Sequence, residues 1–289
     1  MKRKIPKIFL LSVILPLLFA PCAFAKSPGP AVPVGYALTD GTRLTGYLSL
    51  PRDYQAGKRY PAILLIHGGR GDGADRLSRA DGFLETRPVK EHLCRNYVVF
   101  SAAYHSDYFG GPQEIESMAA ALKAMAGLPQ VDRARIAALG VSHGGYLALM
   151  CAGHPQIPVK IKAAVSISGV VDVAAFLQHR YGGSRLAASP AVRAWGWPPD
   201  KDGRTRENYA RLSVLTYLAN FQVPVLVIHG TKDNLVPVSQ ARRLKEALEQ
   251  RQKVFEYLEV PTGRIGGHFI FLTSKVVWEK IEAFLKKYL

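Results

Sequence analysis

The chain is poor in cysteine and has no metal-binding pattern. Only three cysteines occur among its 289 residues, and no cysteine or histidine spacing resembles that of a zinc site. Cys94 and Cys151 both fall in apolar segments, so two buried thiols and one disulfide between them are equally compatible with the sequence. The sequence therefore predicts no metal and no cofactor.

Acidic residues are also scarce. The chain has 22 of them against 38 lysines and arginines, which gives a formal net charge of +16. No basic run is interleaved with aromatic residues, so a nucleic-acid track is not expected. We interpret the charge as a solvated basic surface that favours solubility. A weak attraction to anionic surfaces or substrates is the alternative.

The N-terminal apolar run, residues 8–19, is too short to span a bilayer comfortably. Four basic residues precede it, and Ala23-Phe24-Ala25 follows it as an A-x-A cleavage site. This order predicts a signal peptide over residues 1–25 and a secreted or periplasmic protein that begins near Lys26. Loss of the four basic residues would reduce the formal charge from +16 to +12.

The mature chain, 26–289, alternates apolar runs of strand length with segments of helical periodicity. Asp40-Gly41 indicates a hairpin between strands 34–38 and 42–50. The continuous apolar run 61–66 is typical of a strand that is buried on both faces. Further strands are expected at 97–103, 136–139, 161–167, 223–228 and 254–260, and helices at 88–95, 112–127, 209–218, 240–249 and 274–289. This order predicts one α/β domain with a mostly parallel sheet and helices on both faces.

Residues 169–208 interrupt the alternation. They contain Tyr181-Gly182-Gly183, Trp195-Gly196-Trp197-Pro198-Pro199 and a charged stretch at 200–207. An insertion between two core strands is where a hydrolase would carry a lid. A lid and an ordinary surface excursion are both compatible with this composition.

The pentapeptide Gly140-Val141-Ser142-His143-Gly144 follows a short apolar run and precedes an apolar, helix-forming one. G-x-S-x-G between a strand and a helix is the nucleophile elbow of α/β-hydrolases. Side chains at the flanking positions of so sharp a turn would collide with the adjoining strand or helix, and glycines at 140, 144 and 145 remove these collisions. Ser142 is therefore the candidate nucleophile.

A serine nucleophile needs a base and an acid, which follow it along the chain in the order acid, then histidine. Asp233 lies in a short loop after the strand at 223–228, and His268 ends a glycine-containing loop after the strand at 254–260. We therefore predict Asp233 as the acid and His268 as the base. His229, at a strand end four residues before Asp233, is expected to pack or bond near the acid.

The tetrahedral intermediate needs two hydrogen-bond donors for its oxyanion. The backbone N–H of His143, directly after the nucleophile, is one candidate. The second is expected from the loop that begins His67-Gly68-Gly69, because glycine lets a backbone N–H face the site. Gly68, Gly69 and the residue after them are equal candidates.

These segments resemble the catalytic domain of the prolyl oligopeptidase family of serine peptidases, over about residues 61–289. The matching blocks are 131–136 with 140–146 around the serine, 224–230 with Asp233 and Val236-Pro237, Gly267-His268, and 209–217 ahead of the acid strand. The resemblance implies an α/β-hydrolase fold with Ser142, Asp233 and His268 as the triad. Peptidases of the family usually carry a β-propeller, for which this chain has no room, and Arg70 stands where a proline often follows His-Gly-Gly.

The sequence thus predicts an exported serine hydrolase that cleaves ester or amide bonds through an acyl-enzyme on Ser142. A carboxylesterase and a peptidase for small peptides both fit this prediction. The alternative from another class is a non-catalytic binding protein on a hydrolase scaffold, held at anionic envelope surfaces by its charge. The oligomeric state has no signal in the sequence.

Overall fold

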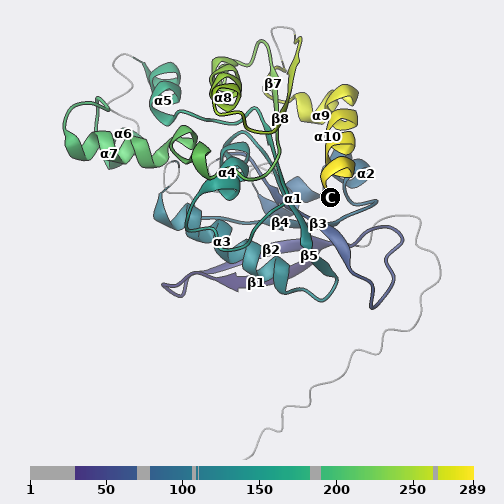
Figure 1. Cartoon of the computed structure of the whole chain (residues 1–289). Coiled ribbons are helices and arrows are strands. Elements are labelled where there is room, and N and C mark those ends of the chain that lie inside the picture. The colour runs from purple at the N-terminus through teal and green to yellow at the C-terminus, as the bar shows by residue number, and fades with distance from the viewer. Residues whose placement is uncertain (1–29, 70–78, 106–108, 110, 183–189, 263–265) are drawn as a thin grey trace, which may run out of the picture.

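The computed structural model of the chain describes residues 30–69, 79–105, 109, 111–182, 190–262 and 266–289 (Figure 1). Its centre is an eight-stranded sheet in the order β1-β2-β4-β3-β5-β6-β7-β8. The first two strands and the β2–β4 pair are antiparallel, and all pairs from β4 to β8 are parallel. The strands are β1 Val32–Ala37, β2 Arg43–Ser49, β3 Tyr60–Ile66, β4 Val98–Ala102, β5 Val131–Val141, β6 Ala163–Ile167, β7 Val225–Gly230 and β8 Phe255–Val260. The predicted α/β-hydrolase class is confirmed. The predicted signal peptide, 1–25, lies outside the described residues.

The segments whose residues are most apolar form the buried central strands. All residues of β4, β6 and β7 are buried, as are all but one of β3, because helices cover both faces of a parallel sheet. The predicted hairpin joins β1 and β2, with Ala37 paired to Arg43 across the turn. Gly41 has φ 86° in this turn, a left-handed conformation that glycine adopts at little cost.

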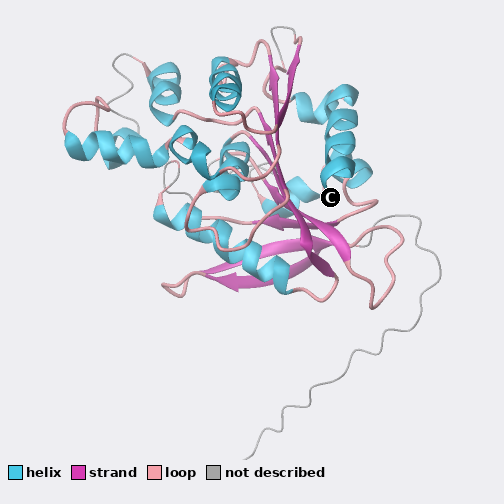
Figure 2. Cartoon of the chain, viewed as in Figure 1, coloured by secondary structure: helices cyan, strands magenta, loops and turns pink. Residues whose placement is uncertain are grey.

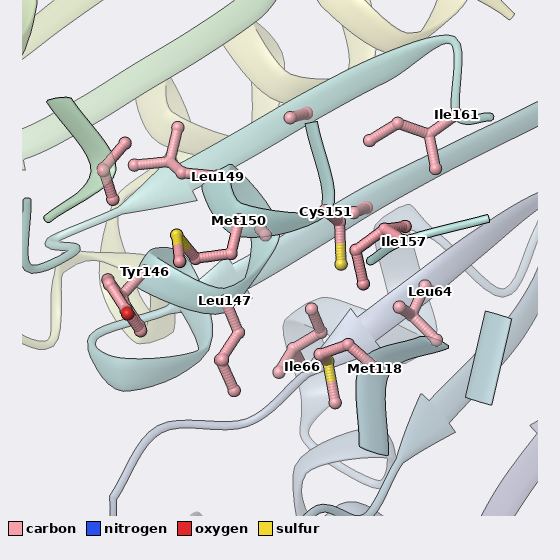
Figure 3. Packing of buried hydrophobic residues seen from close by; sticks show 14 of the residues in the cluster. Leu64, Ile66, Met118, Tyr146, Leu147, Leu149, Met150, Cys151, Ile157 and Ile161 are labelled. Carbon is pink, nitrogen blue, oxygen red and sulfur yellow. The ribbon is translucent and has the colours of Figure 1, made fainter. Parts of the chain in front are cut away.

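Helices cover the two faces of the sheet in two groups (Figure 2). One group packs its apolar residues into a core with Leu64 and Ile66 of β3, and the other packs against Ile63 and Leu65 of the same strand. Figure 3 shows the first core, where Met118 and Leu147 lie beside Leu64 and Ile66. The first group includes α3 Pro112–Gly127, α4 His143–Gly153 and α8 Ser239–Gln250, and the second includes α1 Ala80–Leu84, α2 Arg87–His92, α9 Ile270–Thr273 and α10 Lys275–Tyr288.

Most expected elements have bounds within about three residues of the observed ones, and two differ by more. Strand β5 starts at Val131, five residues before the apolar run that predicted it. The single helix expected at 209–218 is wrong: α7 Gly203–Leu212 ends there, and the 3₁₀ helix Val214–Asn220 follows. Ser213 separates the two because its backbone is extended and its hydroxyl accepts a hydrogen bond from Leu215 N. Asp202, within the stretch assigned to the insertion, caps α7 through Thr205 N.

Residues 169–208 contribute three helices between β6 and β7: α5 Val173–Tyr181, α6 Pro190–Trp195 and most of α7. In Figure 1 they gather at the left, outside the sheet. Trp197 packs edge-on against Tyr209, with 5.9 Å between ring centroids, and the Tyr209 hydroxyl donates to Gly196 O. The insertion is thus a packed helical unit, and its role as a lid stays a prediction.

The described residues also settle the cysteine question. Cys94 and Cys151 are both buried and both free. No group of histidine, cysteine and carboxylate side chains in the described ranges could hold a metal ion. Within those same ranges, no helix combines the length and the apolar composition needed to cross a bilayer.

Candidate active site

Ser142 occupies the turn between β5 and α4, at the carboxyl end of a central strand. Its backbone has φ 57° and ψ −120°, a conformation that an L-residue adopts only under strain. The Ser142 N–H donates to the carbonyl oxygen of Ile167 at 2.8 Å, which ties the turn to the end of β6. The predicted elbow therefore has its expected strand–turn–helix geometry.

The three glycines around Ser142 are required by close backbone contacts. A Cβ on Gly140 would overlap the carbonyl oxygen of Gly144, and a Cβ on Gly144 would overlap those of Ile66 and His67. A Cβ on Gly145 would lie 2.9 Å from Ser166 Oγ. The helix α4 can thus begin directly against β3 and β6 only with glycine at these positions.

Asp233 and His268 meet as predicted. His268 Nδ1 donates to Asp233 Oδ2 at 2.7 Å, and both residues are buried. The other carboxylate oxygen, Oδ1, accepts from the backbone N–H groups of Leu235 and Val236, each at 2.9 Å. These hydrogen bonds fix the orientation of the Asp233 carboxylate. The bond to His268 uses Nδ1, on the opposite side of the imidazole from Nε2.

His229 is a second imidazole on the same carboxylate. Its Nε2 lies 2.9 Å from the carbonyl oxygen of Val236 and 3.3 Å from Asp233 Oδ2, and the side chain is fully buried. Both neighbours are acceptors, so Nε2 carries the proton. The expectation that His229 bonds near the acid is confirmed.

Replacing His229 with phenylalanine is expected to lower kcat about tenfold, which corresponds to about 1.4 kcal/mol of transition-state free energy. Phenylalanine keeps the buried volume but removes a hydrogen bond that restrains the Asp233 carboxylate. His229→Gln places a donor near the lost Nε2–H and should recover part of the rate. Steady-state kinetics on the folded variants measures the effect, and a wild-type kcat for His229→Phe would contradict it.

The environment of Asp233 stabilises its charged form. Burial raises the pKa of the carboxyl, but the hydrogen bonds from His229 and His268, the charge of His268 and the Val236 N–H outweigh burial. The pKa of Asp233 is therefore held well below its usual value of 3.8. Asp233 is ionised throughout the range in which a histidine base works.

This lowered pKa predicts how stability responds to acid. A carboxyl whose pKa is lower in the folded than in the unfolded chain stabilises the fold at pH values above its unfolded pKa. This stabilisation is lost as the pH falls through the pKa of the folded chain. The difference in Tm between wild type and Asp233→Asn should therefore be largest at about pH 7 and should become smaller below about pH 4. Thermal unfolding across this range tests the prediction, which a difference that widens on acidification would contradict.

The loops that carry Asp233 and His268 cross with backbone against backbone. A Cβ on Gly230 would overlap the carbonyl oxygen of Gly267, and a Cβ on Gly267 would lie 2.5 Å from Asp233 N. Glycine at both positions therefore sets the separation of the two loops. It also explains why a glycine lies three positions before Asp233 and another directly before His268.

Gly267→Ala is expected to lower kcat/KM about 100-fold, because the methyl group must push His268 away from Asp233, and displacements of ~1 Å can have effects of this size. Gly127→Ala, at the end of α3, is the matched control, since a Cβ there has nothing within 4 Å. Kinetics of both variants provides the measurement. Equal kcat/KM in the two would show that the loop crossing does not position the histidine.

The predicted oxyanion loop borders Ser142. A Cβ on Gly68 would lie 3.3 Å from Ser142 Cβ, so the backbone of Gly68 passes directly beside the serine. Gly69 has φ 77°, in the left-handed region. The residue after them, the third candidate, lies outside the described residues.

The hydroxyl of Tyr104, which the sequence analysis above did not name, donates to His67 O at 3.1 Å. The ring of Tyr104 stacks on that of His67, with centroids 4.5 Å apart.

His143, the residue after Ser142, has a buried side chain with a partner that the sequence analysis missed. Its Nε2 lies 3.0 Å from Glu114 Oε2, and Glu114 in α3 is fully buried. A signal existed: Glu114 falls on the same helical stripe as Met118 and Met125, which are core residues. A carboxylate at such a position indicates a buried partner.

Comparison with known proteins decides the family. The sequence profile of the prolyl oligopeptidase family matches residues 103–289. The chain belongs to this family. The family is one of serine peptidases, and the curated relatives carry peptidase names. The matched range contains Ser142, Asp233 and His268.

Two curated relatives illustrate the range of the family. Dipeptidyl-peptidase 5 of Porphyromonas gingivalis is 26% identical over 232 residues, which cover 77% of this chain and 33% of that protein. The uncharacterized peptidase YtmA of Bacillus subtilis is 25% identical over 225 residues, covering 76% of this chain and 80% of that protein. The chain thus spans about a third of the first relative and most of the second.

Solved structures share the fold. The acylaminoacyl peptidase of Pyrococcus horikoshii superposes with a TM-score of 0.70 at 19% identity, over 91% of this chain and 42% of that one. Thermogutta terrifontis esterase 2, phosphonylated by cyclosarin, superposes with a TM-score of 0.65 at 21% identity. The match covers 89% of this chain and 94% of that one. These likenesses confirm the α/β-hydrolase fold of this family member.

Proposed function

We propose that this prolyl oligopeptidase family member is an exported serine peptidase that cleaves short peptides through an acyl-enzyme on Ser142. The observation that carries the proposal is the arrangement of three strand ends. β5 presents Ser142 in a strained turn, while the adjacent β7 and β8 present Asp233 and His268 as a hydrogen-bonded pair. This is the set of groups that acyl transfer needs.

In this mechanism the Ser142 hydroxyl attacks the scissile carbonyl carbon while His268 Nε2 accepts its proton. Asp233 holds Nδ1–H at 2.7 Å, which fixes the tautomer and stabilises the imidazolium as it forms. The oxyanion accepts hydrogen bonds from the N–H of His143 and from an N–H of the loop at Gly68 and Gly69. His268 then donates its proton to the leaving amine, and water releases the acyl group by the same steps.

Peptide substrates are favoured over esters by the relatives. Dipeptidyl-peptidase 5 and YtmA carry peptidase names, and the second is matched over most of its length. Small esters undergo acyl transfer with the same groups, so they should also react. We therefore expect hydrolysis of aminoacyl and dipeptidyl anilides, with short-chain p-nitrophenyl esters as secondary substrates.

The test uses the mature protein, beginning at Lys26, and a fluorophosphonate probe with mass mapping of the labelled peptide. Labelling of Ser142 and turnover of anilides would support the proposal. Labelling with ester turnover alone would replace the peptidase assignment by a carboxylesterase. Absence of labelling would overturn the serine mechanism.

Export is tested separately, by expressing the full chain and a form that lacks residues 1–25. The proposal expects the full chain outside the cytoplasm, with a new N-terminus near Lys26. It expects the shortened form to stay in the cytoplasm. An uncleaved full chain that remains in the cytoplasm would overturn the export assignment.

A further inference from the structure

The helix that follows Ser142 begins weakly. The Ser142 side chain does not cap α4, and the first three residues of the helix are His143, Gly144 and Gly145. Each glycine costs a helix about 1 kcal/mol relative to alanine. The close contacts described above nevertheless demand glycine at both positions. The carbonyl oxygen of the peptide unit between Ser142 and His143 accepts a hydrogen bond from Tyr146 N at 3.1 Å, so a side-chain contact would be a second restraint on this unit.

The side chain of His143 supplies such a contact. Its Nε2 bonds to Glu114 Oε2 at 3.0 Å, and its ring stacks on Phe109 with centroids 4.5 Å apart and planes 9° from parallel. Within the described residues, the other nitrogen, Nδ1, is buried without a hydrogen-bond partner. The hydrogen bond to Glu114 is thus the polar restraint on the imidazole.

Glu114 is itself firmly held. It lies in the first turn of α3, where the helix dipole favours a negative charge, and its N–H donates to Gly111 O at 3.1 Å. The side chain is fully buried, and a buried carboxylate is tolerated only with hydrogen-bonding partners. Glu114 is therefore a firmly held anchor on a neighbouring helix, while His143 is the first residue of a helix that Ser142 does not cap.

We propose that Glu114 is a positioning residue for the oxyanion site: by holding the His143 imidazole, it fixes the backbone N–H that donates to the tetrahedral intermediate. This inference rests on the proposed function, because it assigns Glu114 to the step in which Ser142 attacks. The Glu114–His143 bond adds a side-chain restraint at a helix start that Ser142 does not cap. Its effect falls on the transition state and leaves ground-state binding unchanged.

The test compares Glu114→Leu, Glu114→Gln and the control Glu116→Gln, two residues along the same helix. With the active fraction measured by fluorophosphonate titration, Glu114→Leu should lower kcat about 10- to 100-fold with KM within about twofold. Affinity for a peptidyl boronic acid, which mimics the tetrahedral intermediate, should fall by the same factor. Glu114→Gln keeps a hydrogen bond to the imidazole and should recover most of the rate, while Glu116→Gln should match wild type.

A variant that leaves His143 unpaired in the core can fail to fold, so the double variant Glu114→Leu/His143→Phe completes the design. It removes both buried polar groups, which makes it less disruptive than either single change, and keeps a ring against Phe109. The proposal expects this protein to fold and still turn over slowly. Wild-type kcat per labelled site, in this variant or in Glu114→Leu, would overturn it.

The outcomes separate the two proposals. If wild-type Ser142 is labelled and the Glu114 variants turn over normally, only the positioning role fails. If wild-type Ser142 is not labelled, the serine mechanism fails, and the role of Glu114 in it fails as well. A lower active fraction with unchanged kcat per labelled site would mean that Glu114 serves stability alone, which also contradicts the proposal.

Discussion

Ser142→Ala is expected to lower kcat by about 10⁶-fold and to abolish fluorophosphonate labelling, because it removes the hydroxyl that forms the proposed acyl-enzyme. The substitution removes one oxygen atom and leaves the Cβ that lies beside Gly68, so the fold should persist. Kinetics, probe labelling and thermal unfolding on the same preparation provide the measurements.

Ser274→Ala is the matched control for this experiment. Its hydroxyl caps α10 by accepting a hydrogen bond from Val277 N and is not one of the proposed triad groups. Losing the cap should reduce the free energy of unfolding by about 1 kcal/mol and leave labelling intact. Equal labelling of Ser142→Ala and wild type would refute the assignment of the nucleophile.

Gly144→Ala is expected to have the largest effect on stability, about 4 kcal/mol or more in the free energy of unfolding. The added methyl group would overlap the carbonyl oxygens of Ile66 and His67, which belong to β3 and the loop after it. Neither can move without breaking the centre of the sheet, and the interior has no space for the displacement. Soluble yield and denaturant unfolding measure the loss.

Gly203→Ala separates this collision from a general effect of alanine at the start of a helix. Gly203 is the first residue of α7, and a Cβ there has nothing within 4 Å. Alanine should be neutral or slightly stabilising at this position. A folded Gly144→Ala protein with wild-type stability would show that α4 can shift away from β3.

Local sequence patterns predicted the elbow at Ser142 and the Asp233–His268 pair, and the structure shows both. The elbow is read from glycines whose collisions the structure confirms, and Asp233 and His268 each follow an apolar run that forms a strand. Carboxyl ends of adjacent parallel strands share one edge of the sheet, so residues far apart in the sequence meet there. Topology thus places these separate sequence signals at one edge of the sheet.

What the sequence missed depends on contacts between elements. The bond between Glu114 and His143 joins two helices, and only the position of Glu114 on a buried stripe hinted at it. The break at Ser213 arises where a serine hydroxyl accepts a backbone hydrogen bond, in competition with the helix. Apolar periodicity does not report such competition, so the helix expected at 209–218 had wrong bounds.

The crossing of the loops at Gly230 and Gly267 has a consequence for engineering and for divergence within the family. Since the backbones touch at these two glycines, a change of either loop at this contact is expected to disturb the other. A chimaera that imports the segment after β8 from a relative must import the segment after β7 with it. We expect the two loops to behave as one transplantable cassette.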